Sequence, residues 1–229
     1  IREGLVEPIL IGDPEKVRTA LQESGETGVS LQVVNPYNPA LLQHNAAEYM
    51  AIQKAKGKDI SEEEAVKAVK NPLAAGALMV RRGEAEIGVA GNLSSTADVI
   101  RAGLRMVGTA AGSKTVSSFF FMLKDNRVCM FTDCAVIPEP TSAQLADIAI
   151  STADVYKRVM GDEARVALLS FSTKGSAKHE RVDKVRAALE EIKTREPNLL
   201  VDGELQLDAA VEPEVARLKA PGSPVAGNA

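Results

Sequence analysis

Short apolar segments alternate with helical segments along most of this chain, and this alternation constrains the fold more than any other feature. The segment ARVALLSF (164–171) is apolar almost without interruption, as in a strand that other elements cover on both faces. Four more strands are predicted in LVEPILIG (5–12), VSLQVVNP (29–36), EIGVAG (86–91) and NLLVDG (198–203). The pattern predicts an α/β protein with a largely parallel sheet.

Local capping signals predict where several helices begin. Asp13 followed by Pro14 fits an N-cap and the first helical position. The stretch 61–64, Ser-Glu-Glu-Glu, has the form of a capping box, and Thr141 with Gln144 has the same form.

The segment 116–137 interrupts the alternation, because it has the pattern of two paired strands around a turn at 124–127. We therefore predict two domains, a first α/β domain over residues 1–115 and a second over 116–229. The chain starts like the end of a helix that runs into a strand, and it stops in a loop. We therefore expect the first domain to be incomplete.

The composition argues against several classes of protein. The net charge of the 229 residues is −4, which gives no global attraction to nucleic acid or to an acidic membrane surface. Tryptophan is absent and aromatic residues make up 3%, so a base-stacking surface is not expected. No apolar run is as long as a membrane span, and the first residues lack the pattern of a signal or transit peptide. We expect no nucleic-acid or membrane partner and a cytoplasmic location.

The two cysteines, Cys129 and Cys134, lack metal-ligand spacing and have no histidine nearby. A reduced, cytoplasmic chain is the favoured interpretation. A disulfide across the predicted hairpin is the alternative.

One stretch places small hydroxyl residues where a predicted strand passes into a helix. Gly91 and Asn92 end the strand, and Ser94, Ser95 and Thr96 follow at the helix N-terminus. Free backbone N–H groups and the helix dipole make that position attractive to an anion. In a doubly wound sheet, ligands also gather at the carboxyl ends of strands.

Two arginines follow on the same predicted helix. Arg101 and Arg105 share one face and add positive charge, which favours a pocket for a phosphate-bearing ligand. A simpler interpretation makes Ser95 an ordinary N-cap, with Asp98 as its capping partner and Arg101 in a surface ion pair. The residues alone leave both interpretations open.

A second stretch has the same order of strand, loop and helix. After the strand at 164–171, a glycine allows a sharp turn, a lysine adds charge and a serine can cap the next helix. The loop residues are Ser172, Thr173, Lys174, Gly175 and Ser176. Their order differs from that of a Walker loop. A capped helix with an exposed lysine is the alternative, but two such loops favour a phosphate-bearing ligand between them.

Three carboxylates, Asp202, Glu204 and Asp208, lie close together near the end of the chain. They suggest metal ligation or acid–base chemistry. We favour the alternative that they lie at a helix N-terminus and interact with its dipole. His44 and His179 are both expected to be exposed to solvent, so neither is a catalytic candidate.

Four segments resemble the phosphate acetyltransferase (phosphotransacetylase) family. They are VAGNLSSTADVIRAGLR (89–105), TDCAVIPEPTSAQLADIA (132–149), LLSFSTKGSAKHERVDKV (168–185) and VDGELQLDAAVEPEVARLKAPGSPVAG (201–227). The likeness covers essentially the whole chain, and the sequence looks most like the type associated with ethanolamine utilisation. It implies an acyltransferase that interconverts acetyl-CoA and phosphate with acetyl phosphate and CoA.

The resemblance also implies a fold. Family members are similar to isocitrate and isopropylmalate dehydrogenases, with two α/β domains, an active site in the cleft between them and a homodimeric assembly. CoA and phosphate are substrates in such an enzyme, and neither a cofactor nor a metal is implied at the reacting centre.

The resemblance assigns roles to individual residues. The active-site arginine of the family's S-T-A-D-x-x-R motif matches Arg101, which would hold the phosphoryl group. Phosphate or CoA contacts would come from Asn92, Ser94, Ser95, Thr96, Ser172, Thr173, Lys174, Gly175 and Ser176. A second family arginine falls on Gln53, and Lys54 or Lys56 would replace it only in part.

The family pattern continues beyond the last segment of this chain. That further segment carries an N-D-L-S-R-G-C-S motif, in which a serine–arginine pair contacts phosphate and a nearby aspartate takes the thiol proton. This sequence does not contain the motif, so we expect the chain alone to be inactive.

Three alternatives remain for the function. Phosphate butyryltransferase differs only in the size of its acyl pocket. A metal-dependent decarboxylating dehydrogenase of similar fold would use Asp202, Glu204 and Asp208 to bind Mg²⁺. A non-catalytic anion-binding module would keep the fold without turnover.

Overall fold

The chain forms two compact units, Ile1–Gly108 and Thr109–Ala229. The computed structural model describes residues 4–25, 31–110, 113–125, 127–134 and 136–229. The predicted domain boundary between 115 and 116 lies a few residues after this division and stays a prediction.

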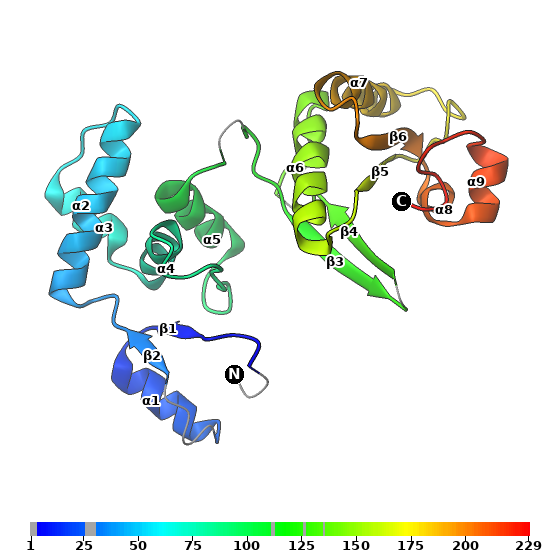
Figure 1. The fold of residues 1–229 in the computed structure, drawn as a ribbon. Helices are drawn as coiled ribbons and strands as arrows, with labels where there is room; N and C mark the ends of the chain where they lie inside the picture. The colour runs from blue at the N-terminus through cyan, green and yellow to red at the C-terminus, as the bar shows by residue number, and fades with distance from the viewer. Residues whose placement is uncertain (1–3, 26–30, 111–112, 126, 135) are drawn as a thin grey trace. The chain divides into compact units, whose positions relative to one another are not determined.

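The first unit is mainly helical and contains one small sheet (Figure 1). Strands β1 (Ile9–Ile11) and β2 (Gln32–Val34) pair in parallel. The helices are α1 (Pro14–Glu23), α2 (Pro39–Ala55), α3 (Glu62–Val69), α4 (Pro72–Arg81), α5 (Thr96–Ala102) and a π-helical turn, η1 (Gly103–Val107).

The core of the first unit lies between α2, α3, α4 and η1. It combines alanines with larger apolar side chains, and the small alanines allow helix backbones to approach closely. The cluster consists of Ala46, Tyr49, Ile52, Ala65, Val69, Ala74, Leu78 and Met106.

The second unit has an antiparallel hairpin and a separate parallel strand pair. Strand β3 (Phe119–Lys124) pairs with β4 (Arg127–Thr132) in the hairpin. Strand β5 (Arg165–Leu169) runs parallel to β6 (Leu200–Leu205). The helices are α6 (Ser142–Met160), α7 (Glu180–Arg195), α8 (Leu207–Val211) and α9 (Pro213–Lys219).

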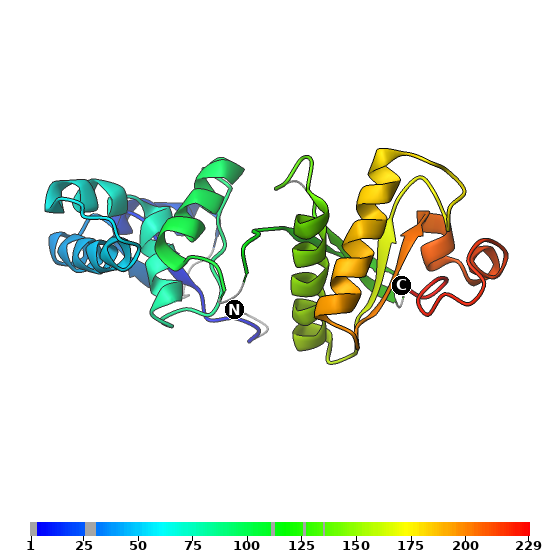
Figure 2. The ribbon, with the colours of Figure 1, turned by 90° about the horizontal axis from the view of Figure 1, so that it is seen from above.

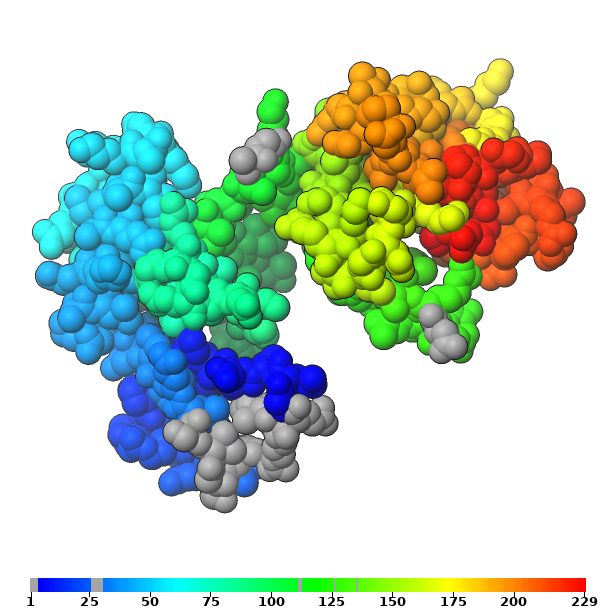
Figure 3. All heavy atoms as spheres, in the orientation of Figure 1, coloured from blue at the N-terminus to red at the C-terminus, as the bar shows by residue number. Residues whose placement is uncertain are grey.

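Helices α6 and α7 lie side by side, and both contribute to the main core of this unit with β5 and β6 (Figure 2). The buried cluster consists of Ala146, Ala149, Leu168, Val185, Ala188, Leu189, Ile192 and Val201. The segment after α9 folds back on α8, where Gly227 N donates to Ala209 O and Ala229 N donates to Ala210 O. Figure 3 shows this C-terminal segment in red.

The predicted helix starts are confirmed by the capping geometry. The Asp13 side chain accepts hydrogen bonds from the first turn of α1, with Pro14 as the first helical residue. Complete capping boxes are present at Ser61 before α3 and at Thr141 before α6.

The predicted sheet is wrong. Instead of one largely parallel sheet, the described residues form three sheets of two strands each. The segment 86–91 is not a strand, because no other described segment pairs with it, and Ile87 and Val89 are 79% and 96% exposed. The chain is α/β with small sheets, so the isocitrate/isopropylmalate dehydrogenase-like fold is corrected as well.

Candidate functional site

The loop 172–176 lies between β5 and α7 and is attached to β6 by backbone hydrogen bonds. Ser170 N donates to Leu205 O at 2.8 Å, and Lys174 N donates to Glu204 O at 3.1 Å. The parallel register of β5 and β6 brings the loop to the carboxyl end of both strands, where α/β proteins bind their ligands. The loop therefore lies after a strand and before a helix, as the sequence predicts.

A buried carboxylate, that of Glu204, lies beneath this loop. The residue is only 1% exposed. Its Oε1 accepts hydrogen bonds of 2.8 Å from both the Ser172 hydroxyl and the Gly175 amide. The Arg186 guanidinium on α7 donates Nε to Oε2 at 2.8 Å and Nη2 to Oε1 at 3.1 Å. A buried charge needs such partners, because burial removes its hydration.

The same contacts keep Glu204 ionised. Burial by itself raises the pKa of this carboxyl, but the hydrogen bonds from Arg186, from the Gly175 amide and from the Ser172 hydroxyl outweigh it. Together they lower the pKa of Glu204 from 4.5 to about 2. Glu204 is therefore a fixed negative charge at neutral pH and cannot act as a general acid there.

Lys174 is paired with a second carboxylate of β6. Its ammonium contacts Asp202, which is 5% exposed, while the Lys174 side chain remains 39% exposed. Burial raises the pKa of Asp202, yet the hydrogen bonds from Lys174, the Ser223 side chain and the Gly203 amide bring it below its usual value. Lys174 has a φ of +46°, in the left-handed region, so its backbone is held in a conformation that few lysines adopt.

Thr173 and Ser176 complete the loop. Thr173 N donates to the Ser176 hydroxyl at 3.0 Å, and the Thr173 hydroxyl accepts from Gln206 N at 2.9 Å. Ser172 and Thr173 are buried, at 0% and 5% exposed. The hydroxyl groups of this loop therefore bond mainly to the protein itself.

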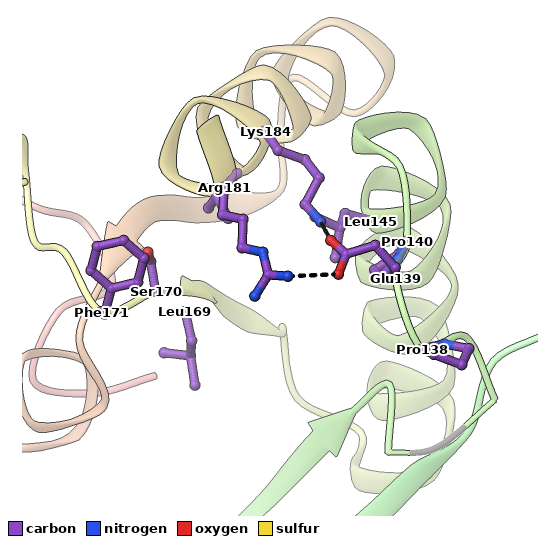
Figure 4. Close-up of a pocket in the computed structure, with 10 residues that line it drawn as sticks. Pro138, Glu139, Pro140, Leu145, Leu169, Ser170, Phe171, Arg181 and Lys184 are labelled. Atoms are coloured by element: carbon purple, nitrogen blue, oxygen red, sulfur yellow. Dashed lines mark hydrogen bonds and ion pairs between the residues drawn. The ribbon is translucent and has the colours of Figure 1, made fainter. Parts of the chain in front are cut away.

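A cavity of about 330 Å³ opens next to the loop (Figure 4). Leu169, Ser170 and Phe171 line it from the end of β5, and Arg181 and Lys184 reach into it from α7. Leu145, Val185, Pro138 and Pro140 make much of the remaining wall apolar. The cavity thus combines an apolar interior with two cations.

Glu139 pairs with both cations and offsets part of their charge. Its carboxylate accepts from Lys184 Nζ at 2.5 Å and from Arg181 Nη2 at 3.3 Å. The hydrogen bond from Lys184 and the charge of Arg181 lower the pKa of Glu139. An anionic ligand that entered the cavity would compete with Glu139 for both side chains.

The stretch with Ser94, Ser95, Thr96 and Arg101 lies in the first unit. Its geometry is that of an ordinary N-cap with a surface ion pair. Ser95 is the N-cap of α5, and its hydroxyl accepts from Asp98 N at 3.2 Å. Arg101 Nη1 donates to Asp98 Oδ1 at 2.5 Å, and the Arg101 side chain is 52% exposed. The Ser95 and Arg101 interactions lower the pKa of Asp98, with Ser95 contributing most.

The neighbours of Arg101 in the predicted site are accessible. Asn92, Ser95 and Thr96 are exposed, and Ser94 is half-buried. The role of these residues in anion binding remains a prediction, since their geometry satisfies an ordinary N-cap. The loop at 172–176 belongs to the other unit.

The position of the second family arginine is buried. Gln53 on α2 is 7% exposed. Lys56, by contrast, is exposed, and its Nζ lies 3.5 Å from Leu104 O on η1, the element that directly follows α5. Whether Lys54 or Lys56 replaces the family arginine stays a prediction.

The favoured interpretation of the three carboxylates is wrong for two of them. Asp202 and Glu204 belong to strand β6, and only Asp208 lies in the first turn of a helix, α8, where it binds Lys219 at 2.7 Å. Among the residues that the structure describes, no group of three His, Cys, Asp or Glu side chains is placed to hold a metal ion.

Sequence reasoning missed Arg186, the partner of Glu204. It is one of several basic residues on α7, and nothing in its local pattern distinguishes it. The signal that could have identified it is the position of Glu204 in a strand with apolar neighbours, which requires a cationic partner nearby.

His44 and His179 are both exposed, as predicted. His179 is the N-cap of α7 and its ring packs edge-on against Phe171. Cys129 and Cys134 are free thiols, so the alternative of a disulfide across the hairpin does not hold in this structure. Within the described ranges, no helix has the length and apolarity to cross a membrane.

The sequences of known proteins identify relatives along the whole chain. A family model described as "Phosphate acetyl/butaryl transferase" matches residues 1–229. A phosphate acetyltransferase of Thermoanaerobacterium thermosaccharolyticum is 43% identical over 235 residues, which cover 100% of this chain and 70% of that protein. A phosphate acetyltransferase of Clostridium acetobutylicum is 42% identical with the same coverage.

Solved structures give the same result. A phosphotransacetylase from Streptococcus pyogenes matches with a TM-score of 0.87 and 38% identity, covering 100% of this chain and 69% of that one. The EutD phosphotransacetylase from Staphylococcus aureus matches with a TM-score of 0.84 and 34% identity, covering 98% and 68%. These matches replace the dehydrogenase-like fold with that of the phosphotransacetylases, and they confirm the family resemblance. The chain belongs to the phosphate acetyl/butaryl transferase family.

Proposed function

We propose that this chain provides the phosphate acetyltransferase activity of its family, the interconversion of acetyl-CoA and phosphate with acetyl phosphate and CoA. The observation that carries this proposal is the family match over all 229 residues, together with phosphate acetyltransferases at 43% and 42% identity over the full chain. The reaction makes the protein an acyltransferase. The dehydrogenase and the non-catalytic module are not favoured by these relatives.

The reaction requires control of two negative charges, that of the CoA thiolate and that of the leaving phosphate. The thiolate of CoA attacks the carbonyl carbon of acetyl phosphate, so that a C–S bond forms and phosphate leaves with the electrons of the broken C–O bond. A thiol has a pKa of about 8.5 and is mostly protonated at neutral pH, so a base must take its proton. The family resemblance places this base, an aspartate, in the motif that this sequence does not contain.

Arg101 is proposed to hold the phosphoryl group. A guanidinium presents planar, paired donors that fit phosphate oxygens, and it neutralises the charge that develops on them. The half-exposed Arg101 side chain would exchange its contact with Asp98 for the substrate. Additional hydrogen bonds are proposed from Asn92, Ser94, Ser95 and Thr96.

The loop 172–176 and the cavity beside it are proposed to receive CoA. Lys174 offers a partly exposed ammonium, and Arg181 and Lys184 offer two more cations at the cavity. The apolar wall that includes Leu169 and Phe171 suits the less polar pantetheine arm. Ser172, Thr173, Gly175 and Ser176 would then form the rigid base of this site.

We further propose that the reaction uses no metal or organic cofactor, because arginines and N–H groups can carry the charge of the phosphoryl group. A cytoplasmic location fits the two free thiols. A homodimeric assembly and the absence of nucleic-acid and membrane partners complete the proposal.

The experiment is the release of free thiol from acetyl-CoA by the intact enzyme, measured with and without inorganic phosphate. Phosphate-dependent release supports the transferase. Turnover that needs NAD(P) and a metal would instead support the dehydrogenase, and anion binding without turnover would support the module. Butyryl-CoA in the same assay measures the acyl-chain preference.

A further inference from the structure

All five consecutive backbone amides from Thr173 to Ala177 are used within the protein. Thr173 N donates to the Ser176 hydroxyl, and Ser176 N donates to Thr173 O. Lys174 N donates to the backbone carbonyl of Glu204, and Gly175 N donates to its carboxylate. Ala177 N donates to the Ser172 hydroxyl at 3.0 Å. A loop that binds phosphate through its amides needs them free, so this loop serves a ligand in another way.

Glu204 occupies the position that an anion would take in such a loop. It receives a hydroxyl donor from Ser172, an amide donor from Gly175 and the two-pronged guanidinium of Arg186. This combination of a hydroxyl, an amide and a guanidinium is the donor set that binds phosphate in many proteins. Here the protein supplies its own carboxylate to this donor set.

The consequence is that Glu204 fixes Lys174. The amide of Lys174 is bound to the Glu204 carbonyl, and the amide of the next residue, Gly175, is bound to the Glu204 carboxylate. Gly175 has a φ of +89°, and Arg186 Nη2 would be 3.4 Å from a Cβ at this position, so the turn also packs against the guanidinium. The Lys174 ammonium is thus presented from a backbone that cannot shift without breaking the Glu204 contacts.

We propose that Glu204 is a positioning residue, whose contacts with Ser172, Gly175 and Arg186 set where Lys174 meets a phosphoryl group of the substrates. This inference rests on the proposed function, because it assigns the loop to CoA or phosphate. Glu204 itself does not contact substrate. The shared ligand chemistry is a phosphoryl group, which both CoA and acetyl phosphate carry.

The experiment compares three variants with the wild-type enzyme. Glu204→Gln keeps the size of the side chain but loses its charge, and Arg186→Lys keeps the charge but loses the two-pronged contact. Ser172→Ala removes the hydroxyl that bonds to Glu204 and to the Ala177 amide, and it leaves the Glu204–Arg186 pair intact. It therefore tests the loop even where the other two variants fold poorly. Asp147→Asn is the matched control, because Asp147 also pairs with an arginine of α7, Arg195 at 2.8 Å.

Two readouts are measured for each protein. Steady-state kinetics give kcat and separate KM values for CoA and for acetyl phosphate, which distinguishes the two sources of the phosphoryl group. Hydrogen exchange of amides 173–177 reports the loop directly and needs no turnover. If the Glu204–Arg186 pair were purely structural, its loss would lower stability but would not raise the KM for one substrate more than that for the other.

The expected result is faster exchange of amides 173–177 in the first three variants, with one KM raised by about tenfold and kcat changed far less. The Asp147→Asn control should have the KM values and the loop exchange rates of the wild type. Variants with unchanged KM values, or with loop amides as protected as in the wild type, would overturn the positioning role. Intact wild-type enzyme that neither turns over nor binds CoA would instead overturn the proposed function. The exchange data on the loop remain informative in that case, because they do not depend on turnover.

Discussion

The Arg186 guanidinium holds the buried Glu204 carboxylate through both of its oxygens, with Nε 2.8 Å from Oε2 and Nη2 3.1 Å from Oε1. The carboxylate is on strand β6 and the guanidinium is on helix α7, so this pair joins two elements of the core. The Glu204 side chain is 2% exposed, whereas that of Arg186 is 42% exposed. The contact therefore anchors a buried charge to a cation that keeps part of its hydration.

The stability of the second unit should depend on pH through Glu204. The pKa of this carboxyl falls from 4.5 to about 2 on folding, so the folded state favours the ionised form. This contribution is complete above the unfolded pKa and is lost as the pH falls through the folded pKa. It amounts to about 3 kcal/mol in the free energy of unfolding.

Urea unfolding at several pH values from pH 6 to pH 2 measures how this contribution to the free energy of unfolding changes with pH. The wild type should lose more stability across this range than Glu204→Gln, by roughly the amount given above. Asp154→Asn serves as the control, because it removes a carboxylate from the exposed pair with Arg158. Equal pH dependence in the wild type and in Glu204→Gln would contradict the assignment.

Substitution of Arg101 should impair the reaction. Arg101→Ala is expected to lower kcat/KM of the intact enzyme roughly 100- to 1,000-fold, comparable to the loss of one oxyanion donor. Arg18→Ala is the matched control, since Arg18 forms the same kind of exposed contact with Glu15, three residues earlier. Initial rates over a range of acetyl phosphate concentrations provide the measurement, and near-wild-type kcat/KM in Arg101→Ala would refute the role.

The residue between the two buried carboxylates of β6 should tolerate no side chain. A Cβ on Gly203 would lie 2.8 Å from the Leu168 Cβ and 3.1 Å from the Leu168 carbonyl oxygen, so β5 and β6 would have to separate. Gly203→Ala should therefore reduce the free energy of unfolding by about 1–3 kcal/mol.

Gly103→Ala is the comparison for this substitution. Gly103 has a helical φ of −55°, and outside its chain neighbours and its own helix backbone no described atom lies within 4 Å of a Cβ built there. This variant is expected to be neutral or to gain a few tenths of a kcal/mol, because alanine has the lower conformational entropy in the unfolded chain. Urea denaturation compares the two, and similar stabilities would mean that β5 and β6 are less closely packed than described.

The cavity beside the loop gives predictions of opposite sign. Glu139→Ala should lower KM for CoA, because it frees Arg181 and Lys184 from their carboxylate partner. Lys184→Ala should raise the same KM, because it removes a cation from the cavity. KM for acetyl phosphate is expected to stay constant in both variants.

The control for the cavity is Glu163→Ala. Glu163 pairs with Lys157, which is exposed and lies on α6 outside the lining of the cavity. This variant frees a lysine in the same way and should leave KM for CoA unchanged. Changes of the same sign in Glu139→Ala and Lys184→Ala would exclude the cavity as the CoA site.

The sequence by itself determined several helix starts and the family. Asp13, Ser61 and Thr141 cap their helices as predicted, because an N-cap bonds to amides two or three residues away and needs no distant partner. The family motifs are equally local, since they are read as continuous segments. The position of the loop 172–176, between a strand and a helix, followed from the same local patterns.

Only the tertiary structure decided which strands pair and which polar groups meet. The apolar segment 86–91 has the composition of a strand, but strand pairing requires another chain segment beside it, and none is there among the described residues. Glu204 was expected at a helix start, yet β6 extends to Leu205 and buries it against Arg186, 18 residues away. The physical reason is that strand pairing and the neutralisation of a buried charge depend on residues far apart in the sequence, whereas helix capping does not.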